Sequence, residues 1–318
     1  MNKQDNKCLA LIVPCMNEQE VLQKTNSELL TLLNKLIDNL LINSNSYIYY
    51  VDDGSTDETW PIIKQLCSEN KNVSGLKLSK NFGHQNALLA GLTRVNNKCD
   101  YVVTIDADLQ QDINAIPEMI DKHYSGVEII FGVRNNRLGD SLFKKKTGDI
   151  YTTFINYLGG NLVKGHADFR LMGKKSVRAL LEYSENNIFI RGIVPELGFK
   201  SSIVKFEQKN RIAGETKYTK LKMFQLAYKG LTSITIAPLR FLIVLGGVSL
   251  ILSFCYVIYV LYTKYVVELA VPGWASIVLP IWIFSSLQLL SIGLLGEYIS
   301  RIFLDIKKRP RFIFEDEL

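Results

Sequence analysis

The side chains most suited to chemistry stand in the run Asp106-Ala107-Asp108, directly after the apolar segment 101–105. Consecutive apolar or β-branched residues predict a buried strand, and the two carboxylates follow its carboxyl end. Open α/β sheets bind their ligands at that end of their parallel strands. Carboxylate oxygens suit Mg²⁺ or Mn²⁺, which commonly carry a diphosphate. The competing interpretation is a surface loop with two solvated acids, because Asp-x-Asp is a common pattern.

Composition narrows the class of protein. The chain has 318 residues, of which 47% are hydrophobic, and a net charge of +6 at pH 7. This length accommodates one large domain or two ordinary ones. The basic excess is compatible with anionic lipid or phosphorylated substrates. The first half has no basic block interleaved with aromatic residues, so no nucleic-acid partner is expected.

The five cysteines are scattered and include no Cys-x-x-Cys pair. This pattern argues against a disulfide framework or a structural zinc site and indicates a reducing compartment. The polar residues 1–7 are followed by an apolar stretch that is too short for the core of a cleavable signal peptide.

Strand-like and helix-like segments alternate through the first half of the chain, which predicts βαβ units and a mostly parallel α/β sheet. Apolar runs predict strands at 8–13, 47–51, 73–78, 101–105 and 127–133, and helical periodicity predicts helices at 20–41, 86–95 and 117–123. Polar residues follow the strand ends repeatedly. Pro14 and Glu18 come after the first strand, and Asp52 and Asp53 come after the second.

Two later segments are basic. The first contains Arg134, Arg137, Lys144 and Lys145, and the second contains Arg211 and Lys217. Arg offers bidentate donors and Lys a point charge, so the first segment is suited to a phosphate group. A face that touches anionic lipid, or an ordinary solvated loop, is the alternative.

Two uncharged runs, 241–263 and 270–296, are long enough to cross a bilayer. Basic residues flank the pair on both outer sides, whereas the connection holds only Lys264 and Glu268. The positive-inside rule therefore predicts two transmembrane helices, with the polar domain and both termini in the cytoplasm. We expect a catalytic domain at 1–215, an amphipathic juxtamembrane segment at 216–238, the two spans within 239–300 and a cytoplasmic tail at 301–318.

The order of several motifs carries a resemblance to a known family. The segments 13–18, 51–57 and 106–108 together resemble the GT-A fold, a Rossmann-like α/β architecture, of family 2 glycosyltransferases. Five further motifs look like those of the polyprenyl-phosphate glycosyltransferases, namely Asn81-Phe82-Gly83-His84, Asp106-Ala107-Asp108-Leu109-Gln110, Asp168-Phe169-Arg170, Ala213-Gly214-Glu215-Thr216-Lys217 and Pro238-Leu239-Arg240. That group includes dolichol-phosphate mannose synthase and the bacterial bactoprenol glucosyltransferases of O-antigen modification. The resemblance covers essentially the whole chain.

The resemblance implies a metal-dependent, inverting transfer of one sugar from a nucleotide sugar to polyprenyl phosphate. By analogy the donor is UDP-glucose and the acceptor is undecaprenyl phosphate, for O-antigen, lipopolysaccharide or other cell-envelope glycans. A UDP-N-acetylhexosamine, an aminoarabinose-type donor and GDP-mannose are the alternatives. The resemblance also implies a place in the bacterial inner membrane and a homo-tetramer.

The resemblance also implies roles for individual residues. It places the nucleotide at Pro14, Glu18, Asp52, Asp53, Asp106, Arg211 and Lys217, the Mg²⁺ or Mn²⁺ at Asp106, Asp108 and Gln110, the acceptor phosphate at Arg134, Arg137, Lys144 and Lys145, and catalysis at Asp108 and Asp168. The residues themselves leave two roles open. Glu18 is equally an acid favoured at the start of a helix, and Asp168 is either a general base or the ion-pair partner of Arg170. We expect Asp108 to lie between the nucleotide pocket and the phosphate site.

Three other classes are less well supported. A processive polysaccharide synthase would carry a Gln-x-x-Arg-Trp motif, which this chain lacks. A non-catalytic membrane scaffold would not need the intact Asp106/Asp108 pair. A soluble dinucleotide-binding protein would show Gly-x-Gly-x-x-Gly after the first strand, and that pattern is missing.

Overall fold

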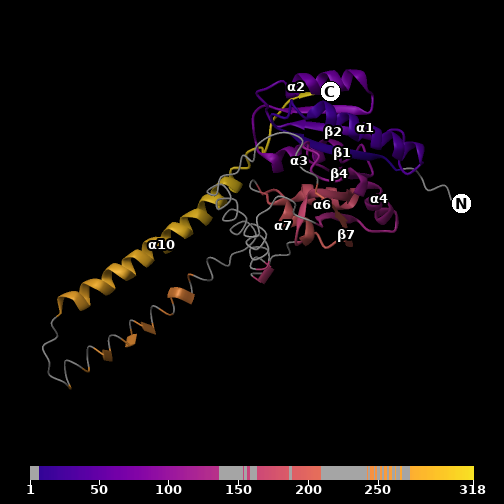
Figure 1. Ribbon diagram of the computed structural model, residues 1–318. Helices are drawn as coiled ribbons and strands as arrows, with labels where there is room; N and C mark the ends of the chain where they lie inside the picture. Colours follow the sequence, from indigo (N-terminus) through magenta and orange to yellow (C-terminus); the bar gives the residue numbers. More distant parts are fainter. Residues whose placement is uncertain are drawn as a thin grey trace. The chain divides into compact units, whose positions relative to one another are not determined.

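Figure 1 shows the computed structural model, which describes residues 7–135, 163–185, 188–208 and 273–318, with isolated positions between 153 and 157 and between 242 and 266. The chain divides into two compact units. The first comprises Met1–Ser233 and Pro310–Leu318, and the second comprises Ile234–Arg309. The first unit carries the sheet, and the second contains helix α10 (Trp274–Ile306).

The first unit is built on an eight-stranded sheet with the order β7-β5-β6-β4-β1-β2-β3-β8. The strands are β1 (Leu9–Cys15), β2 (Tyr47–Asp52), β3 (Val73–Leu78), β4 (Tyr101–Thr104), β5 (Ile129–Arg134), β6 (His166–Gly173), β7 (Ser201–Phe206) and β8 (Phe314–Glu317). The four strands β4, β1, β2 and β3 pair in parallel, and so do β5 and β7. The predicted, mostly parallel α/β sheet is therefore confirmed. Strand β6 runs antiparallel to both of its neighbours, and β8 runs antiparallel to β3.

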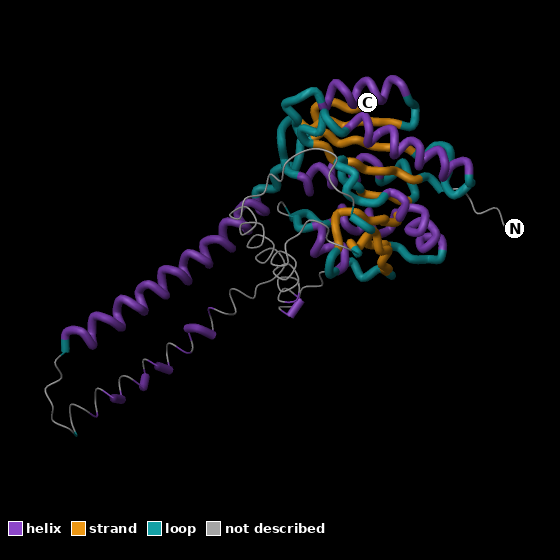
Figure 2. Tube along the Cα trace, viewed as in Figure 1, coloured by secondary structure: helices purple, strands orange, loops and turns teal. Residues whose placement is uncertain are grey.

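Helices cover both faces of the sheet (Figure 2). They are α1 (Leu22–Asp38), α2 (Thr59–Glu69), α3 (His84–Val95), α4 (Ile116–Tyr124), α6 (Lys174–Glu182) and α7 (Ile190–Glu196). Helices α1, α2 and α4 share one apolar core, and α3, α6 and α7 share the other. Every residue of β1 is buried, as expected for a parallel strand covered on both faces. The two cores fix the parallel strands β4, β1, β2 and β3 from both faces, so the carboxyl ends of these strands lie at the same edge of the sheet.

The C-terminal residues complete the sheet rather than leave it. Strand β8 pairs with β3. Glu317 accepts a hydrogen bond from the Tyr49 hydroxyl at 3.0 Å and forms an ion pair with Arg94 Nε at 3.2 Å. The Arg94 guanidinium also lies 4.0 Å from the centre of the Phe314 ring. The sequence predicts a tail at 301–318, but within that range the structure has the end of α10 and an edge strand held by backbone pairing and charge.

Among the described residues, no helix is both long enough and apolar enough to cross a membrane. Helix α10 includes most of the second predicted span, while the first span and the juxtamembrane segment 216–238 lie mainly or wholly outside the described residues. The two spans therefore stay a prediction.

The turn after β2 requires glycine at position 54. Its φ is +68°, and a Cβ there would lie 2.4 Å from the carbonyl carbon of Lys80 and 2.7 Å from the nitrogen of Asn81. Residues with a Cβ rarely adopt this conformation. The loop before α3 thus packs directly against the turn after β2, and any side chain at position 54 would push the two apart.

We expect Gly54→Ala to destabilise the protein more than Gly126→Ala. Both positions have positive φ, which costs a residue with a Cβ about 1 kcal/mol. Only Gly54 adds a backbone clash, worth about 1–3 kcal/mol more by analogy with overpacked cores, because a Cβ at Gly126 meets nothing within 4 Å. Thermal unfolding of the two full-length variants measures the difference. Equal losses would contradict the close approach of the two loops.

Candidate functional site

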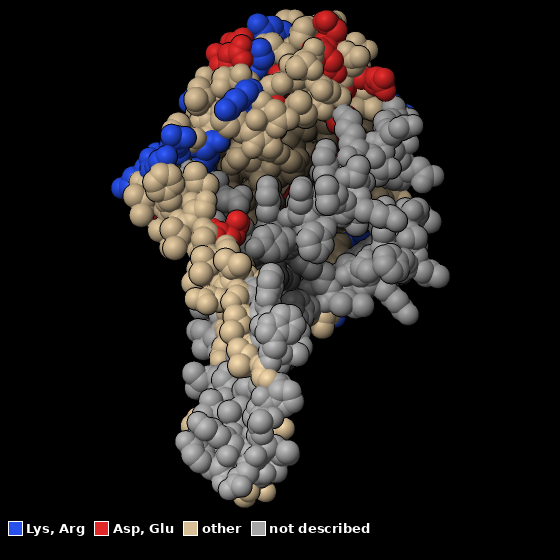
Figure 3. Space-filling model, turned by 90° about the vertical axis from the view of Figure 1, so that its left-hand side faces the viewer, with Lys and Arg blue, Asp and Glu red and all other residues tan. Residues whose placement is uncertain are grey.

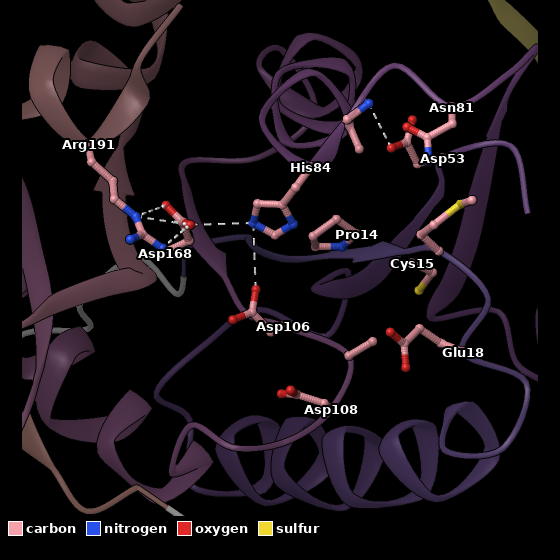
Figure 4. A pocket seen from close by; sticks show the side chains of 14 residues that line it. Pro14, Cys15, Glu18, Asp53, Asn81, His84, Asp106, Asp108, Asp168 and Arg191 are labelled. Carbon is pink, nitrogen blue, oxygen red and sulfur yellow. Dashed lines mark hydrogen bonds and ion pairs between the residues drawn. The ribbon is translucent and has the colours of Figure 1, made fainter. Parts of the chain in front are cut away.

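A cavity of about 400 Å³ lies at the carboxyl ends of β1, β2 and β4 (Figure 4). Helix α3, strand β6 and helix α7 also contribute to its wall. Its ionisable side chains are Cys15, Glu18, Asp53, His84, Asp106, Asp108, Asp168 and Arg191. Figure 3 shows one face of the molecule. The described surface on this face has a hollow, and the described side chains around it are mainly uncharged. Polar residues that follow different strands in the sequence thus meet at one cavity in the fold.

Hydrogen bonds join the loop after β1 to the loop after β2. Ser55 Oγ accepts from the Asn17 N–H at 3.0 Å, and Asn17 Oδ1 accepts from the Thr56 N–H at 2.9 Å. Thr59 Oγ1 accepts from the Glu18 N–H at 2.9 Å. These bonds hold Asn17 at a φ of 55°, which residues other than glycine seldom adopt. Ser55 and Thr56 thus fix Asn17, and Thr59 at the start of α2 fixes the backbone of Glu18 in the cavity wall.

The two acids that end β2 have different surroundings. Asp53 lines the cavity, and its carboxylate accepts from the N–H groups of Phe82 and Gly83 at 2.8 and 2.9 Å. Burial raises the pKa of Asp53, and these two hydrogen bonds oppose that rise. Asp52 is fully buried, accepts from the Ser55 N–H at 3.2 Å and does not line the cavity. The structure therefore brings Asp53, but not Asp52, to the predicted nucleotide site.

The turn after β4 carries Asp106 and Asp108 into the cavity wall. Thr25 on α1 is fully buried, and its hydroxyl donates to the Ala107 carbonyl at 2.7 Å. Gln111 contacts Asp106 twice. Its Nε2 donates to Asp106 Oδ2 at 2.6 Å, and its Oε1 accepts from the Asp106 N–H at 2.9 Å. Helix α1 and Gln111 together anchor the acid pair.

The donor set fits a divalent cation that arrives with a diphosphate. Among the described residues, no group of three or more His, Cys, Asp or Glu is arranged to hold a metal ion. Mg²⁺ and Mn²⁺ need fewer protein ligands, because they bind through one or two carboxylates together with water and substrate phosphates. Asp106 and Asp108 share the cavity and provide such a pair. The predicted third ligand, Gln110, does not line the cavity, and its Oε1 accepts from Gln208 Nε2 at 3.3 Å.

Asp168 is the most heavily paired acid of the site. Arg191 Nη2 donates to its Oδ2 at 2.6 Å, Arg191 Nε lies 3.2 Å from both oxygens, and the fully buried Arg170 donates to its Oδ1. Burial alone would raise the pKa of Asp168, but Arg191, His84 and Arg170 outweigh it and hold the pKa well below its ordinary value. Of the two roles left open by the sequence, these contacts favour the ion pair over the general base.

The His84 imidazole lies between two carboxylates (Figure 4). Its Nε2 is 3.4 Å from Asp168 Oδ2 and 3.7 Å from Asp106 Oδ1. Burial alone would lower the pKa of His84, but the hydrogen bond to Asp168 and the charge of Asp106 outweigh it and raise the pKa above its ordinary value. His84 therefore links the acid pair after β4 to the Asp168 cluster.

Sequence reasoning assigns no chemistry to His84 and does not single out Arg191. His84 follows the third strand after a glycine, so the recurrent polar strand ends were a signal that pointed to it. Arg191 had no such signal, because no helix was predicted at 190–196. The structure brings α7 to this place, where Gln85 Oε1 accepts from the Ile190 N–H at 3.2 Å.

The predicted phosphate ligands are placed only in part. Arg134 ends β5, and its N–H donates to the Gly165 carbonyl at 3.2 Å, but it does not line the cavity. The other basic residues predicted to bind phosphate groups lie outside the described residues, namely Arg137, Lys144, Lys145, Arg211 and Lys217. The expected position of Asp108 between two sites therefore has support on the nucleotide side alone.

We expect Asp168→Asn to cost about 3–5 kcal/mol of folding free energy, because it leaves the charge of fully buried Arg170 without its carboxylate. Arg191→Gln is the matched control. It should cost less, since Asp168 keeps Arg170 and the Arg191 side chain is 43% exposed. Chemical unfolding at neutral pH measures both variants. An Asp168→Asn protein as stable as the wild type would contradict the role of this pair.

The stabilisation by Asp168 also has a defined pH dependence. Its pKa is depressed in the folded protein, so the contribution is fully present above the unfolded value of about 3.9 and is lost as pH falls toward the lower folded value. The difference in unfolding free energy between the wild type and Asp168→Asn should thus not shrink from pH 7 to about pH 5. The raised pKa of His84 depends on its hydrogen bond to Asp168, so this second group should enlarge the difference as pH falls toward about 6.5. A difference that disappears in this range would contradict the depressed pKa.

Known proteins match almost the whole chain. Residues 10–181 match the family described as glycosyl transferase family 2. The chain is 45% identical over 316 residues to "Uncharacterized glycosyltransferase YkoT" of Bacillus subtilis (strain 168), with 99% of this chain and 94% of the relative covered. It is 32% identical over 311 residues to the "Prophage bactoprenol glucosyl transferase homolog" of Escherichia coli (strain K12), with 96% and 98% covered. It is also 32% identical over 313 residues to the "Bactoprenol glucosyl transferase" of Shigella phage SfV, with 97% and 98% covered. The chain therefore belongs to glycosyltransferase family 2 and is an enzyme with a GT-A-like α/β fold.

Proposed function

We propose that this enzyme transfers a single sugar from UDP-glucose to the phosphate of a polyprenyl phosphate, undecaprenyl phosphate in a bacterium. The observation on which the proposal depends is that the acidic and the basic side chains of the cavity come from different structural elements. The acids Glu18, Asp53, Asp106 and Asp108 lie along the ends of β1, β2 and β4, while His84 and Arg191 come from α3 and α7. Relatives named bactoprenol glucosyl transferase support the choice of sugar and acceptor.

The acidic side is suited to the donor. A cavity of about 400 Å³ has the size of ordinary small-ligand sites. Glu18 and Asp53 offer carboxylate acceptors for the hydroxyl and N–H groups of a nucleoside. Asp106 and Asp108 would hold a Mg²⁺ or Mn²⁺ ion, which supplies electrostatic neutralisation of the nucleoside diphosphate leaving group.

The basic side is suited to the acceptor. Arg191 lines the cavity with 43% of its side chain exposed, and a guanidinium matches the geometry of phosphate oxygens. A phosphate monoester has its second pKa near 6 and is largely dianionic at neutral pH. It therefore attacks the anomeric carbon without a strong base, in agreement with an Asp168 that stays ionised between two guanidinium groups. We propose that Arg134 and the basic segments 137–145 and 211–217 complete the phosphate sites.

We further propose that the reaction takes place at the cytoplasmic face of the bacterial inner membrane, where the product feeds O-antigen or other envelope glycans. The uncharged runs 241–263 and 270–296, with basic residues on their outer sides, support two spanning helices. An acceptor with a long hydrocarbon chain supports the same placement. A homo-tetramer is proposed by analogy with the family.

We expect Asp108→Ala to lower transfer by at least about 100-fold, because the diphosphate loses a cation ligand at the leaving group. The assay supplies purified full-length protein in detergent with Mn²⁺ or Mg²⁺, labelled UDP-glucose and a short polyprenyl phosphate, and measures butanol-extractable label. Asp121→Ala, an exposed acid on α4, is the matched control and should retain full activity.

The same assay separates the alternatives. Labelled UDP-N-acetylhexosamines, a UDP-aminoarabinose-type donor and GDP-mannose replace UDP-glucose in parallel reactions, and a clear preference for one of them would correct the sugar. A product that lengthens with time would favour a processive synthase. No transfer from any donor, together with no thermal shift upon nucleotide addition, would favour a non-catalytic scaffold and overturn the proposal.

We expect the product to have the anomeric configuration opposite to that of the donor. Direct attack by the acceptor phosphate displaces the nucleoside diphosphate from the far side, so an α-linked donor gives a β-linked lipid product. Proton NMR of the purified glycolipid reads this configuration from the coupling of the anomeric proton. An α-linked product would contradict a single displacement.

A further inference from the structure

Gln111 is a buried polar side chain next to the acid pair, with 1% of its surface exposed. Both ends of its amide engage Asp106. Nε2 donates to the carboxylate at 2.6 Å, and Oε1 accepts from the backbone N–H at 2.9 Å. Because both bonds go to one residue, the amide holds the backbone and the side chain of Asp106 together.

This clamp leaves one carboxylate oxygen facing the cavity. Oδ2 of Asp106 accepts from Gln111, whereas Oδ1 pairs with His84 Nε2 at 3.7 Å, and both residues line the cavity. The last torsion of an aspartate side chain is broad when nothing restrains it. The hydrogen bond from Gln111 therefore selects the carboxylate rotation that presents Oδ1 to a ligand.

The neighbouring Gln110 has a different environment. Its Oε1 accepts from Gln208 Nε2 at 3.3 Å, and it does not line the cavity. Side chains that fix a metal-binding carboxylate are commonly worth 10- to 100-fold in metal affinity. The backbone N–H of Gln110 donates to Asp108 Oδ1 at 3.1 Å, and that bond does not depend on the side chain. Of these two adjacent glutamines, Gln111 is the one whose side-chain amide bonds to the carboxylate of Asp106.

We propose that Gln111 is a positioning residue that aims Oδ1 of Asp106 at the divalent cation of the sugar donor. The inference rests on the proposed metal-dependent transfer. Gln111 acts through Asp106 and does not itself touch the cation or the substrate. Its removal should weaken binding of the cation much more than it slows the reaction once the cation is bound.

The test measures Mn²⁺ binding directly. Full-length wild type, Gln111→Met, Gln110→Met, Gln65→Met and Asp108→Ala are titrated with Mn²⁺ in the presence of UDP, and free Mn²⁺ is quantified by electron paramagnetic resonance. We expect Gln111→Met to raise the Kd by about 10- to 100-fold. The matched control is Gln65→Met, at an exposed glutamine on α2, which should leave the Kd within about twofold. In transfer assays, Gln111→Met should need more Mn²⁺ for half-maximal rate but recover most of its kcat when Mn²⁺ is saturating.

If thermal unfolding shows that Gln111→Met does not fold, Gln111→Asn replaces it. This variant keeps an amide, but its side chain is too short to reach Asp106. A wild-type Kd in the folded Gln111 variants would overturn the inference. So would a loss confined to Gln110→Met, which would restore Gln110 as a ligand. If the wild type itself binds no Mn²⁺, the proposed metal dependence fails, and that result is distinct from a failure of Gln111 alone.

Discussion

The site depends first on the burial of one charge cluster. Arg170 is fully buried on β6, and a buried guanidinium is stable only if a carboxylate matches it. Asp168 stands two residues earlier on the same strand, so both side chains project from one face of the sheet. Arg191 on α7 and His84 on α3 approach the same carboxylate. The need to satisfy this charge therefore draws α3, α7 and β6 around one wall of the cavity.

The opposite wall depends on bonds between loops. Asn17 and Glu18 after β1 are joined to Ser55 and Thr59 after β2, and Asp53 holds the loop that leads to α3. Positive φ values accumulate in these loops, at Asn17, Gly54, Gly83 and Leu109. Such conformations persist only where the surrounding structure enforces them, and they cluster at functional sites. The sheet sets the loop ends, and these mutual hydrogen bonds set their shape.

The two walls explain how a family 2 glycosyltransferase could bring two anions together. In the proposed reaction, a nucleoside diphosphate and a phosphate acceptor repel each other, so each needs its own positive charge. A cation held by Asp106 and Asp108 would serve the first, and Arg191 with His84 would serve the second. His84 lies between an acid of each group, at 3.7 Å from Asp106 and 3.4 Å from Asp168. His84 thereby connects the two charged groups.

Local residue patterns were sufficient for the five parallel-type strands of the first half, for the acid pair after β4 and for the family. Apolar runs and strand-end acids are properties of adjacent residues, and they do not depend on what lies next to them in space. The insertion of β6 between β4 and β5, the pairing of β8 with β3, and the bond of Asp106 to the side chain of Gln111 rather than of Gln110 were visible only in the tertiary structure. So were the burial of Asp52 and the arrival of Arg191. Each of these is a contact between segments distant in sequence or a side-chain orientation that such contacts enforce, and periodicity along the chain carries no information about either.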